Sequence, residues 1–369
     1  MTSIGIQPLI TFTPPGERTA PSPAEARGIP RDEVRLLVAD GDRLRHTHFH
    51  DLADHLEAGD LVVVNTSQTV NGEADALWSG VGRAAREVVV HVAMDLRDDT
   101  WVVEVRTAPD ASRAVLDAIP GQTVTVAGVA TLTLLSPHPR TGSPTGEGNR
   151  LWRAAYSGGV PLRDVLDRVG RPIAYGYLDR RYELTDYQTI FGTTPGSAEM
   201  PSAARPFTPE VVTRLVSRGV GIAPVLLHTG VSSQETGEEP QPEWFEVGES
   251  TARLVNSTRA AGGRVVAVGT TVTRALESAV DGPAGRALLR AGSGWTERVV
   301  TREQPPRIVD GLITGWHDPQ ASHLLLVESI AGVELAQSAY DEAVVQGYRW
   351  HEFGDSALFL PARAEAVAA

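Results

Sequence analysis

The sequence contains no cysteine, and this absence excludes several kinds of chemistry at once. Disulfide bonds, thiol nucleophiles and thiolate metal ligands all require that residue. Lysine is absent as well, since all 33 basic residues are arginines. Neither a Schiff base nor the lysine of a phosphate-binding P-loop can therefore take part in the mechanism.

Long apolar runs and a signal-like N-terminus are also missing. No stretch of the chain approaches the roughly 20 apolar residues that a membrane helix needs. The N-terminus has no basic segment followed by an apolar core, which is the pattern of a signal peptide. We therefore expect a cytoplasmic protein without a membrane partner. The formal net charge of −13 argues against a general polyanion binder, and the sequence gives no signal for an oligomeric state.

The patterning of apolar residues divides the chain into two kinds of segment. Residues 71–156 hold short, alternating, β-branched strands separated by glycine and proline, which is typical of a small antiparallel barrel. Residues 1–70 and 157–369 alternate apolar strands with helix-sized patterns, which favours a parallel or mixed sheet with helices on its faces. We predict a discontinuous α/β domain that carries the active site and is interrupted by an inserted antiparallel β-barrel domain.

The segment GGRVVAVGTTVTRALES is the first candidate for chemistry. A strand ends at Val268, Gly269 makes the turn, and Thr270 and Thr271 occupy positions where helix N-caps belong. Backbone N–H groups at such a helix start attract anions and carboxylates, and Arg274 lies one turn further on. An ordinary strand–helix junction has the same pattern, so this segment alone does not define a site.

Three further segments belong to the same predicted edge of the sheet. Residues 187–207 are too apolar for a solvated linker, and ordered loops of this length usually line sites. His228 closes the strand VGIAPVLLH, and His317 follows an apolar run at 308–314. Ligands of open α/β sheets bind at the carboxyl ends of strands, so the pattern predicts a crevice there. A lone histidine in this position is more often a hydrogen-bonded structural residue.

Motifs that would identify a metal or nucleotide site are missing. The sequence has no HEXXH, GXSXG or GXGXXG motif. The three histidines of HTHFH, residues 46–50, fit a solvated strand face better than a metal site. Spacing alone therefore predicts an α/β protein with a crevice and without a metal.

Taken in order, seven segments resemble the S-adenosylmethionine:tRNA ribosyltransferase-isomerases of queuosine biosynthesis. The resemblance runs from about Leu36 to Leu360. The matching segments read GDLVVVN, YQT, PGS followed by PSA, LHTG, VGTTVTRALES, DGLIT followed by HDP, and FGDSALFL. Each piece is short, but their common order makes the resemblance specific.

The resemblance implies an α/β domain with an inserted β-barrel and a reaction without a metal or prosthetic group. S-adenosylmethionine is the substrate, and its ribosyl group is transferred to the 7-aminomethyl-7-deazaguanine base of tRNA. The group isomerises to an epoxycyclopentane, which gives epoxyqueuosine, while adenine and methionine leave. Such chemistry needs a base for the acidic proton beside the sulfonium, an acid for adenine and a pocket that excludes water.

The resemblance also suggests roles for residues of the matching segments. The GTT turn and Arg274 would hold part of S-adenosylmethionine. His228 or His317 would serve as acid or base. Glu277 or Asp310 would orient a partner residue. The expected catalytic residues are His317, His228, Arg274 and Glu277. The expected substrate-binding residues are Gly269, Thr270, Thr271, Tyr187, Gln188, Asp310 and Asp355. For Asp355 the alternative is a turn cap, and for Tyr187 and Gln188 it is structural packing.

Charged and titratable positions of the family are lost in this chain. Residues 315–321 read GWHDPQA where the family has NFHLPKS, so Gln320 replaces the basic residue. Residues 201–207 read PSAARPF where the family has PTAGLHF, so Pro206 replaces the histidine. These losses favour a second hypothesis, an enzyme of the same fold that binds S-adenosylmethionine or a similar nucleoside and acts on a small molecule or another modified base. A non-catalytic binding protein is the third.

Overall fold

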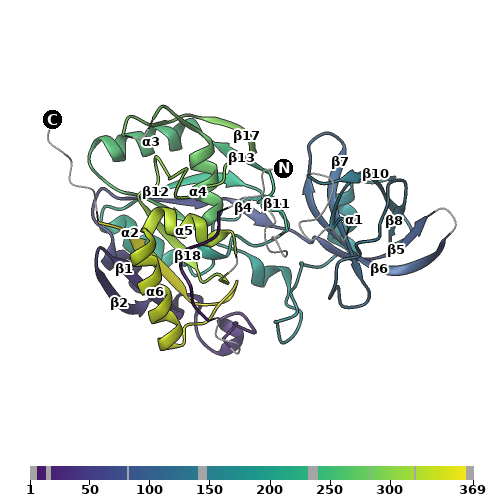
Figure 1. Cartoon of the computed structure of the whole chain (residues 1–369), viewed down its shortest axis with the longest axis horizontal. Helices are drawn as coiled ribbons and strands as arrows, with labels where there is room; N and C mark the ends of the chain where they lie inside the picture. The colour runs from purple at the N-terminus through teal and green to yellow at the C-terminus, as the bar shows by residue number, and fades with distance from the viewer. Residues whose placement is uncertain are drawn as a thin grey trace.

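The chain folds into a large α/β part and a smaller β-barrel that lie next to each other along the long axis of the molecule (Figure 1). This arrangement confirms the predicted fold class, whereas the domain limits at residues 71 and 156 stay a prediction. The computed structural model describes residues 6–13, 18–80, 83–139, 148–231, 240–283, 285–319 and 321–362.

A nine-stranded mixed sheet forms the centre of the α/β part. Its four central strands, β12, β3, β14 and β18, run parallel to one another, so their carboxyl ends share one edge. In spatial order the strands are β17 (Gly292–Thr296), β13 (Glu243–Val247), β12 (Gly221–Leu227), β3 (Leu61–Asn65), β14 (Val265–Val268), β18 (Gly311–Gly315), β19 (Ser356–Leu360), β1 (Arg35–Asp40) and β2 (Arg43–His48).

The central strands are apolar on both faces, because helices cover the sheet on both sides. In β3, Leu61 and Val63 face one hydrophobic cluster, while Val62 and Val64 face another. Side chains of successive strand residues point to opposite faces, so a strand buried on both sides reads as a continuous apolar run. The sequence LVVVN shows this pattern.

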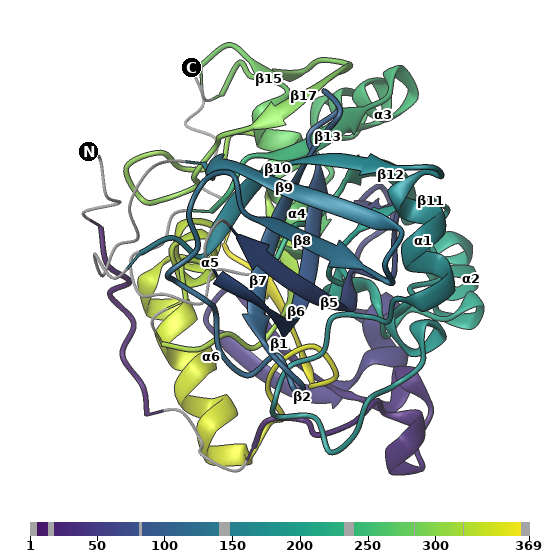
Figure 2. The same ribbon diagram turned by 90° about the vertical axis from the view of Figure 1, so that its right-hand side faces the viewer.

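Six α-helices lie within the described residues: α1 (Leu162–Val169), α2 (Pro209–Ser217), α3 (Glu249–Ala260), α4 (Gly269–Ser278), α5 (His323–Ala331) and α6 (Val333–Gln346). Helices α3 to α6 pack on one face of the sheet, and α2 covers the other with a 3₁₀ helix at Phe49–His55. In Figure 2, α5 and α6 lie on the left of the sheet and α2 on the right. No helix of the described ranges is long and apolar enough to cross a membrane.

The barrel closes on itself with six antiparallel strands and is filled by its own apolar core. Trp152 is its largest fully buried side chain, and α1 covers the barrel with Leu162, Val165 and Leu166. Around the barrel the strands are β10 (Leu151–Gly158), β7 (Thr100–Thr107), β6 (Arg83–Asp95), β5 (Glu73–Gly80), β8 (Thr123–Val126) and β9 (Ala130–Pro137).

A narrow neck joins the barrel to the α/β part. The chain that enters the barrel, β4 (Ser67–Thr69), pairs in parallel with β11 (Thr194–Ser197) on the returning chain. Closer to the barrel, Glu73 and Arg171 exchange two backbone N–H···O=C hydrogen bonds of 2.9 and 2.8 Å. A further strand pair, β15 (Val280–Asp281) with β16 (Leu288–Leu289), lies on the helical side of the α/β part.

Candidate active site

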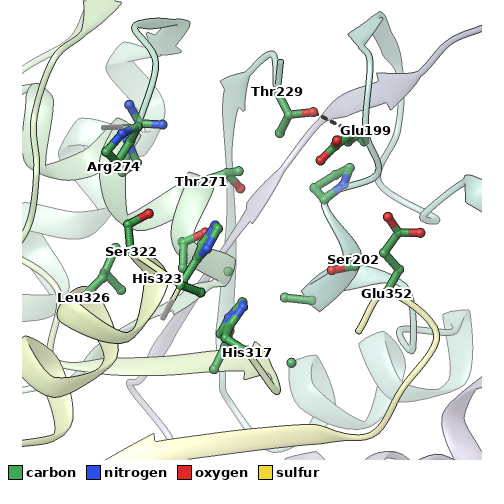
Figure 3. A pocket seen from close by; sticks show the side chains of 18 of the residues that line it. Glu199, Ser202, Thr229, Thr271, Arg274, His317, Ser322, His323, Leu326 and Glu352 are labelled. Atoms are coloured by element: carbon green, nitrogen blue, oxygen red, sulfur yellow. Dashed lines mark hydrogen bonds between the residues drawn. The ribbon is translucent and has the colours of Figure 1, made fainter. Parts of the chain in front are cut away.

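A cavity of about 500 Å³ opens at the carboxyl ends of the parallel strands (Figure 3). Its walls come from the segments that follow β12, β14 and β18, and from parts of the loops at 175–203 and 351–352. We call this cavity the chamber. Its position agrees with the crevice expected from the strand–loop pattern, and residues 199–203 of the predicted site-lining loop are part of its wall.

The GTT turn forms one wall of the chamber, at the start of α4. Gly269 adopts a left-handed backbone with φ +88°, which lets the chain turn directly from β14 into the helix. The sequence placed Thr270 and Thr271 at N-cap positions, but both lie inside the first turn. Val268 is the N-cap and provides no side-chain cap. The orphan N–H groups of this turn therefore depend on solvent or a ligand.

Arg274 lies one turn into α4 and lines the same wall. One of its terminal nitrogens pairs with the carboxylate of Glu243, and the other donates to the Gln241 carbonyl at 2.7 Å. Glu243 also accepts a hydrogen bond of 3.0 Å from the Gly230 backbone N–H. Burial raises the pKa of Glu243 although Arg274 opposes the shift. The guanidinium is thus fixed against the chamber wall.

His317 lines the chamber from the turn after β18. Its Nε2 lies 2.9 Å from Thr314 Oγ1, and its ring stacks on that of His323. Burial, and to a lesser extent the nearby His323 and His351, hold the pKa of His317 well below its usual value. The ring is therefore neutral at physiological pH.

The aromatic residue that precedes His317 has a packing role. Trp316 is fully buried and makes edge contacts with the rings of Tyr340 and Tyr348, at centroid distances of 5.0 and 5.6 Å. This contact fixes the turn on α6 and so holds His317 at the chamber wall. Gln320, which replaces the basic residue of the family motif, lies outside the described residues.

Two glutamates of the chamber were missed by the sequence analysis. Glu199 and Glu352 line the chamber on the side away from Arg274 (Figure 3). Burial first, and then the charge of Glu199, raise the pKa of Glu352 to about 8, although a hydrogen bond from Tyr177 opposes the shift. Only the prediction that residues 187–207 line a site pointed toward Glu199, and no pattern in the sequence marked Glu352.

His228 lies outside the chamber lining, although it follows β12 as expected. Its Nδ1 is 2.8 Å from Ser67 Oγ, and its ring fills the space above Gly196, where an added Cβ would come within 2.4 Å of it. Burial lowers the pKa of His228 to about 4. These contacts connect the entering and returning chains of the neck. His228 therefore has a structural role there.

The two predicted carboxylates, Glu277 and Asp310, also lie outside the chamber lining and accept hydrogen bonds from backbone N–H groups. Glu277 accepts N–H hydrogen bonds from Arg307, Ile308 and Val309 at 2.8 to 3.1 Å. Asp310 accepts one from the Val265 N–H at 2.9 Å. Each carboxylate therefore fixes the loop that leads into β18.

The remaining three predicted residues hold loops near the chamber without lining it. Asp355 accepts backbone N–H hydrogen bonds from Arg35 and Arg349, at 2.9 and 2.8 Å. Tyr187 is buried, and Gln188 donates to the Thr69 carbonyl at 2.9 Å. The structure thus brings together five predicted residues in the chamber: Gly269, Thr270, Thr271, Arg274 and His317.

No group of three or more histidine, cysteine, aspartate or glutamate side chains in the described part of the chain is arranged to hold a metal ion. The chamber instead offers a helix start and Arg274 on one wall, neutral imidazoles beside them, and two carboxyl groups across from them. Such a set can bind a zwitterionic ligand and exchange protons with it.

Comparison with known proteins gives matches along nearly the whole chain. A family model described as "Queuosine biosynthesis protein" matches residues 9–359. The S-adenosylmethionine:tRNA ribosyltransferase-isomerase of Moorella thermoacetica is 33% identical over 357 residues, which cover 94% of this chain and 97% of that protein. The protein of the same name from Gloeobacter violaceus is 35% identical over 350 residues, or 93% and 92% of the two chains.

A solved structure shares the fold. The crystal structure of an S-adenosylmethionine tRNA ribosyltransferase from Thermotoga maritima is similar over 95% of this chain and 99% of that chain. The two sequences are 26% identical, and the TM-score is 0.50. The α/β part and the barrel of this chain therefore have a counterpart of known structure.

Proposed function

Because this chain belongs to the queuosine biosynthesis family, whose members include S-adenosylmethionine:tRNA ribosyltransferase-isomerases, we propose that its chamber is the site of ribosyl transfer and isomerisation. The resemblance found in the sequence is confirmed. The protein is a transferase and isomerase of tRNA modification, and S-adenosylmethionine is its substrate rather than a resident cofactor. The ribosyl group goes to the 7-aminomethyl-7-deazaguanine base of tRNA, and adenine and methionine leave.

The observation that carries this proposal is the placing of the GTT turn and Arg274 on one wall of the chamber. The first turn of α4 presents N–H groups that suit the carboxylate of S-adenosylmethionine. Arg274 adds a positive charge on the same helix, and Glu243 holds it in place. A cavity of about 500 Å³ lies within the range of small-molecule sites, about 300–1,000 Å³.

His317 contributes to this site as a neutral imidazole. Its lowered pKa leaves no second ring proton to give to adenine near pH 7, so we assign it the acceptor role, for a proton or a hydrogen bond. His323 stacks on it and is also neutral, since burial lowers its pKa to about 4. The acid that protonates the departing adenine must then be a residue on another wall of the chamber.

The acceptor and the compartment follow from the same proposal. The names of the relatives give tRNA as the acceptor. In this proposal only the base that is modified enters the chamber, and the rest of the tRNA stays outside it. We place the reaction in the cytoplasm because mature tRNA is found there. The net charge of −13 disfavours broad contact with a polyanion, so recognition would be local to the modified base and its neighbours.

Incubation of the protein with S-adenosylmethionine and tRNA bearing the precursor base tests the proposal. We expect stoichiometric release of adenine and methionine, measured by chromatography, and no release with tRNA that carries an unmodified guanine. Binding of S-adenosylmethionine in a calorimeter without any release on that tRNA would instead support the alternative, an enzyme of the same fold with another acceptor.

A further inference from the structure

Two acidic side chains line the side of the chamber opposite the GTT turn and Arg274. In Figure 3, Glu199 and Glu352 lie across the chamber from Arg274 and His323. They come from separate segments, one before α2 and one after α6. The proposed ribosyl transfer needs an acid at the departing adenine, and neither His317 nor His323 is the imidazolium that such an acid would have to be.

The surroundings of Glu352 are those of a carboxyl group that keeps its proton. Its Oε2 is buried and has no hydrogen-bond partner among the described residues. The Tyr177 hydroxyl acts on the same carboxyl group and favours its charged form, and Glu199 places a second acidic group nearby. Burial and a like charge both favour the neutral form, so Glu352 is largely protonated near pH 7, with a pKa of about 8.

The other charged groups around Glu352 do not cancel this effect. Arg31 and Arg205 border the same wall, and both are paired with Glu25, at 3.0 and 2.9 Å. The remaining titratable neighbours are His351, which stacks on Tyr177 at 4.8 Å, and Asp318, whose carboxylate is 3.7 Å from His351 Nε2.

We propose that Glu352 is the general acid that protonates the departing adenine, with Glu199 and Tyr177 as positioning residues that set the state of its proton. This assignment rests on the proposed function, because it needs adenine to leave from the chamber. Enzymes often place two carboxyl groups in different surroundings, so that one keeps its proton and acts as an acid while the other is charged.

The step balances without any further reactant. The C1′–N bond of the ribosyl group breaks, its electron pair stays on the adenine nitrogen, and the proton of Glu352 joins that nitrogen. A base takes the proton from C5′, beside the sulfonium, and the freed C–H pair forms a C4′=C5′ double bond as the C4′–O4′ bond breaks. The O4′ pair forms the C1′ carbonyl as the C1′–N bond breaks, so every carbon keeps a full set of bonds. Glu352 is left as a carboxylate and regains a proton from the ammonium group of the acceptor, which must lose one to become a nucleophile.

The variant Glu352→Gln keeps the size of the side chain and removes its proton donor. We expect kcat for adenine release to fall by about 10²- to 10⁴-fold, with S-adenosylmethionine binding retained. Analogues of S-adenosylmethionine that carry a less basic purine should lose less, because their leaving group needs less help from an acid. The matched control is Glu87→Gln, at an exposed glutamate of β6 in the barrel, and it should keep the unaltered kcat.

Two further variants separate positioning from mere packing by moving the pH profile in opposite directions. The acid form of Glu352 is active, so kcat should fall as pH rises through about 8. Glu199→Gln removes the like charge, lowers the pKa of Glu352 and moves this limb to lower pH. Tyr177→Phe removes a hydrogen bond that favours the charged form, raises that pKa and moves the limb to higher pH.

An unchanged kcat and pH profile in Glu352→Gln would overturn the assignment while leaving the proposed function intact. If the unaltered protein releases no adenine on any tRNA, the proposed function fails instead. A difference infrared spectrum between the unaltered protein and Glu352→Gln at pH 7 then still tests the proton. We expect a protonated carboxyl band in the unaltered protein, and its absence would overturn the inference by itself.

Discussion

The imidazole rings of His317 and His323 stack on one wall of the chamber, with centroids 4.7 Å apart and planes 5° from parallel. One ring belongs to the turn after β18, and the other begins α5. Two imidazolium charges this close in a buried site would repel each other strongly. Burial lowers the pKa of each ring, and for His317 the neighbouring ring adds to the shift, so both rings of this contact are neutral.

The first prediction concerns these two histidines. Burial, with the neighbouring ring, holds the pKa of His317 well below its usual value, and burial lowers that of His323 to about 4. Neither ring should gain a proton between about pH 6 and 8, the range in which an unperturbed histidine titrates. Nitrogen NMR of labelled imidazoles, assigned with His317→Gln and His323→Gln, measures this. A midpoint of either ring within that range would contradict the stacked, neutral pair.

The second prediction separates two roles of Arg274. Arg274→Met leaves the buried Glu243 without its cation, so the free energy of unfolding should fall by about 3–5 kcal/mol. Adding Glu243→Gln removes the stranded charge and should restore most of that stability. Binding of S-adenosylmethionine should remain weak in both variants, because the positive charge on α4 is missing.

Urea denaturation and calorimetry check the two halves of that prediction. Glu243→Gln alone is the control, since it keeps the arginine and its hydrogen bond to the Gln241 carbonyl. If the double variant bound S-adenosylmethionine as well as the unaltered protein does, Arg274 would act only as a partner of Glu243.

The third prediction concerns the start of α4. Gly269→Ala puts a side chain on a left-handed residue, at a cost of about 1–2 kcal/mol of stability. Its methyl group would also lie 3.3 Å from Ala203 Cβ, so the helix start has to shift. We expect S-adenosylmethionine affinity to fall by about tenfold, equivalent to about 1.4 kcal/mol.

Gly262→Ala is the matched control for Gly269→Ala. Gly262 has a similar φ of +81°, and an added Cβ there meets nothing within 4 Å. This variant should lose comparable stability in thermal unfolding and keep its affinity for S-adenosylmethionine. Equal affinity in the two variants would show that the turn does not touch the ligand.

The fourth prediction concerns a buried charge cluster in the barrel. His91 lies between the buried carboxylates of Glu73 and Glu104, at 3.2 and 3.3 Å. His91→Leu removes one partner from each carboxylate, while two arginines still pair with each of them, so the barrel should lose about 1–3 kcal/mol of stability. Thermal unfolding of the variant measures the loss, and a change below about 1 kcal/mol would contradict it.

The same cluster predicts how stability depends on pH. Its neighbours lower the pKa of Glu73 and Glu104 from 4.5 to about 2, so their contribution is full above 4.5 and is lost as pH falls through about 2. The pKa of His91 is raised above 6.5, so its contribution is full below 6.5 and is lost as pH rises through the raised value. Unfolding curves across pH should show both losses in the unaltered protein, and the alkaline loss should vanish in His91→Leu.

The fold was predictable because its signals are local in the sequence. A strand buried on both faces, such as β3, is a continuous apolar run, and a barrel strand alternates. The helix start at α4 follows from Gly269, although the placement of Thr270 and Thr271 as caps was wrong by two and three residues. Family motifs then gave the order of the elements.

The site was only partly predictable because its members come from distant segments. Position after a strand correctly brought Arg274 and His317 to the chamber. The same rule could not tell that the His228 ring turns toward Ser67 in the neck. Glu199 and Glu352 are separated by most of the α/β part, and no local pattern records that their side chains share a wall.

The neck has a consequence for how such a protein can change over time. Backbone hydrogen bonds between Glu73 and Arg171 hold the entering and returning chains together. The chain therefore enters and leaves the barrel at the same place. Among the described residues, the chamber walls contain none from the six barrel strands. We therefore expect changes within the barrel to leave the chamber walls in place as long as the apolar contact of Met94 and Val102 with Ala198 and Val231 is kept.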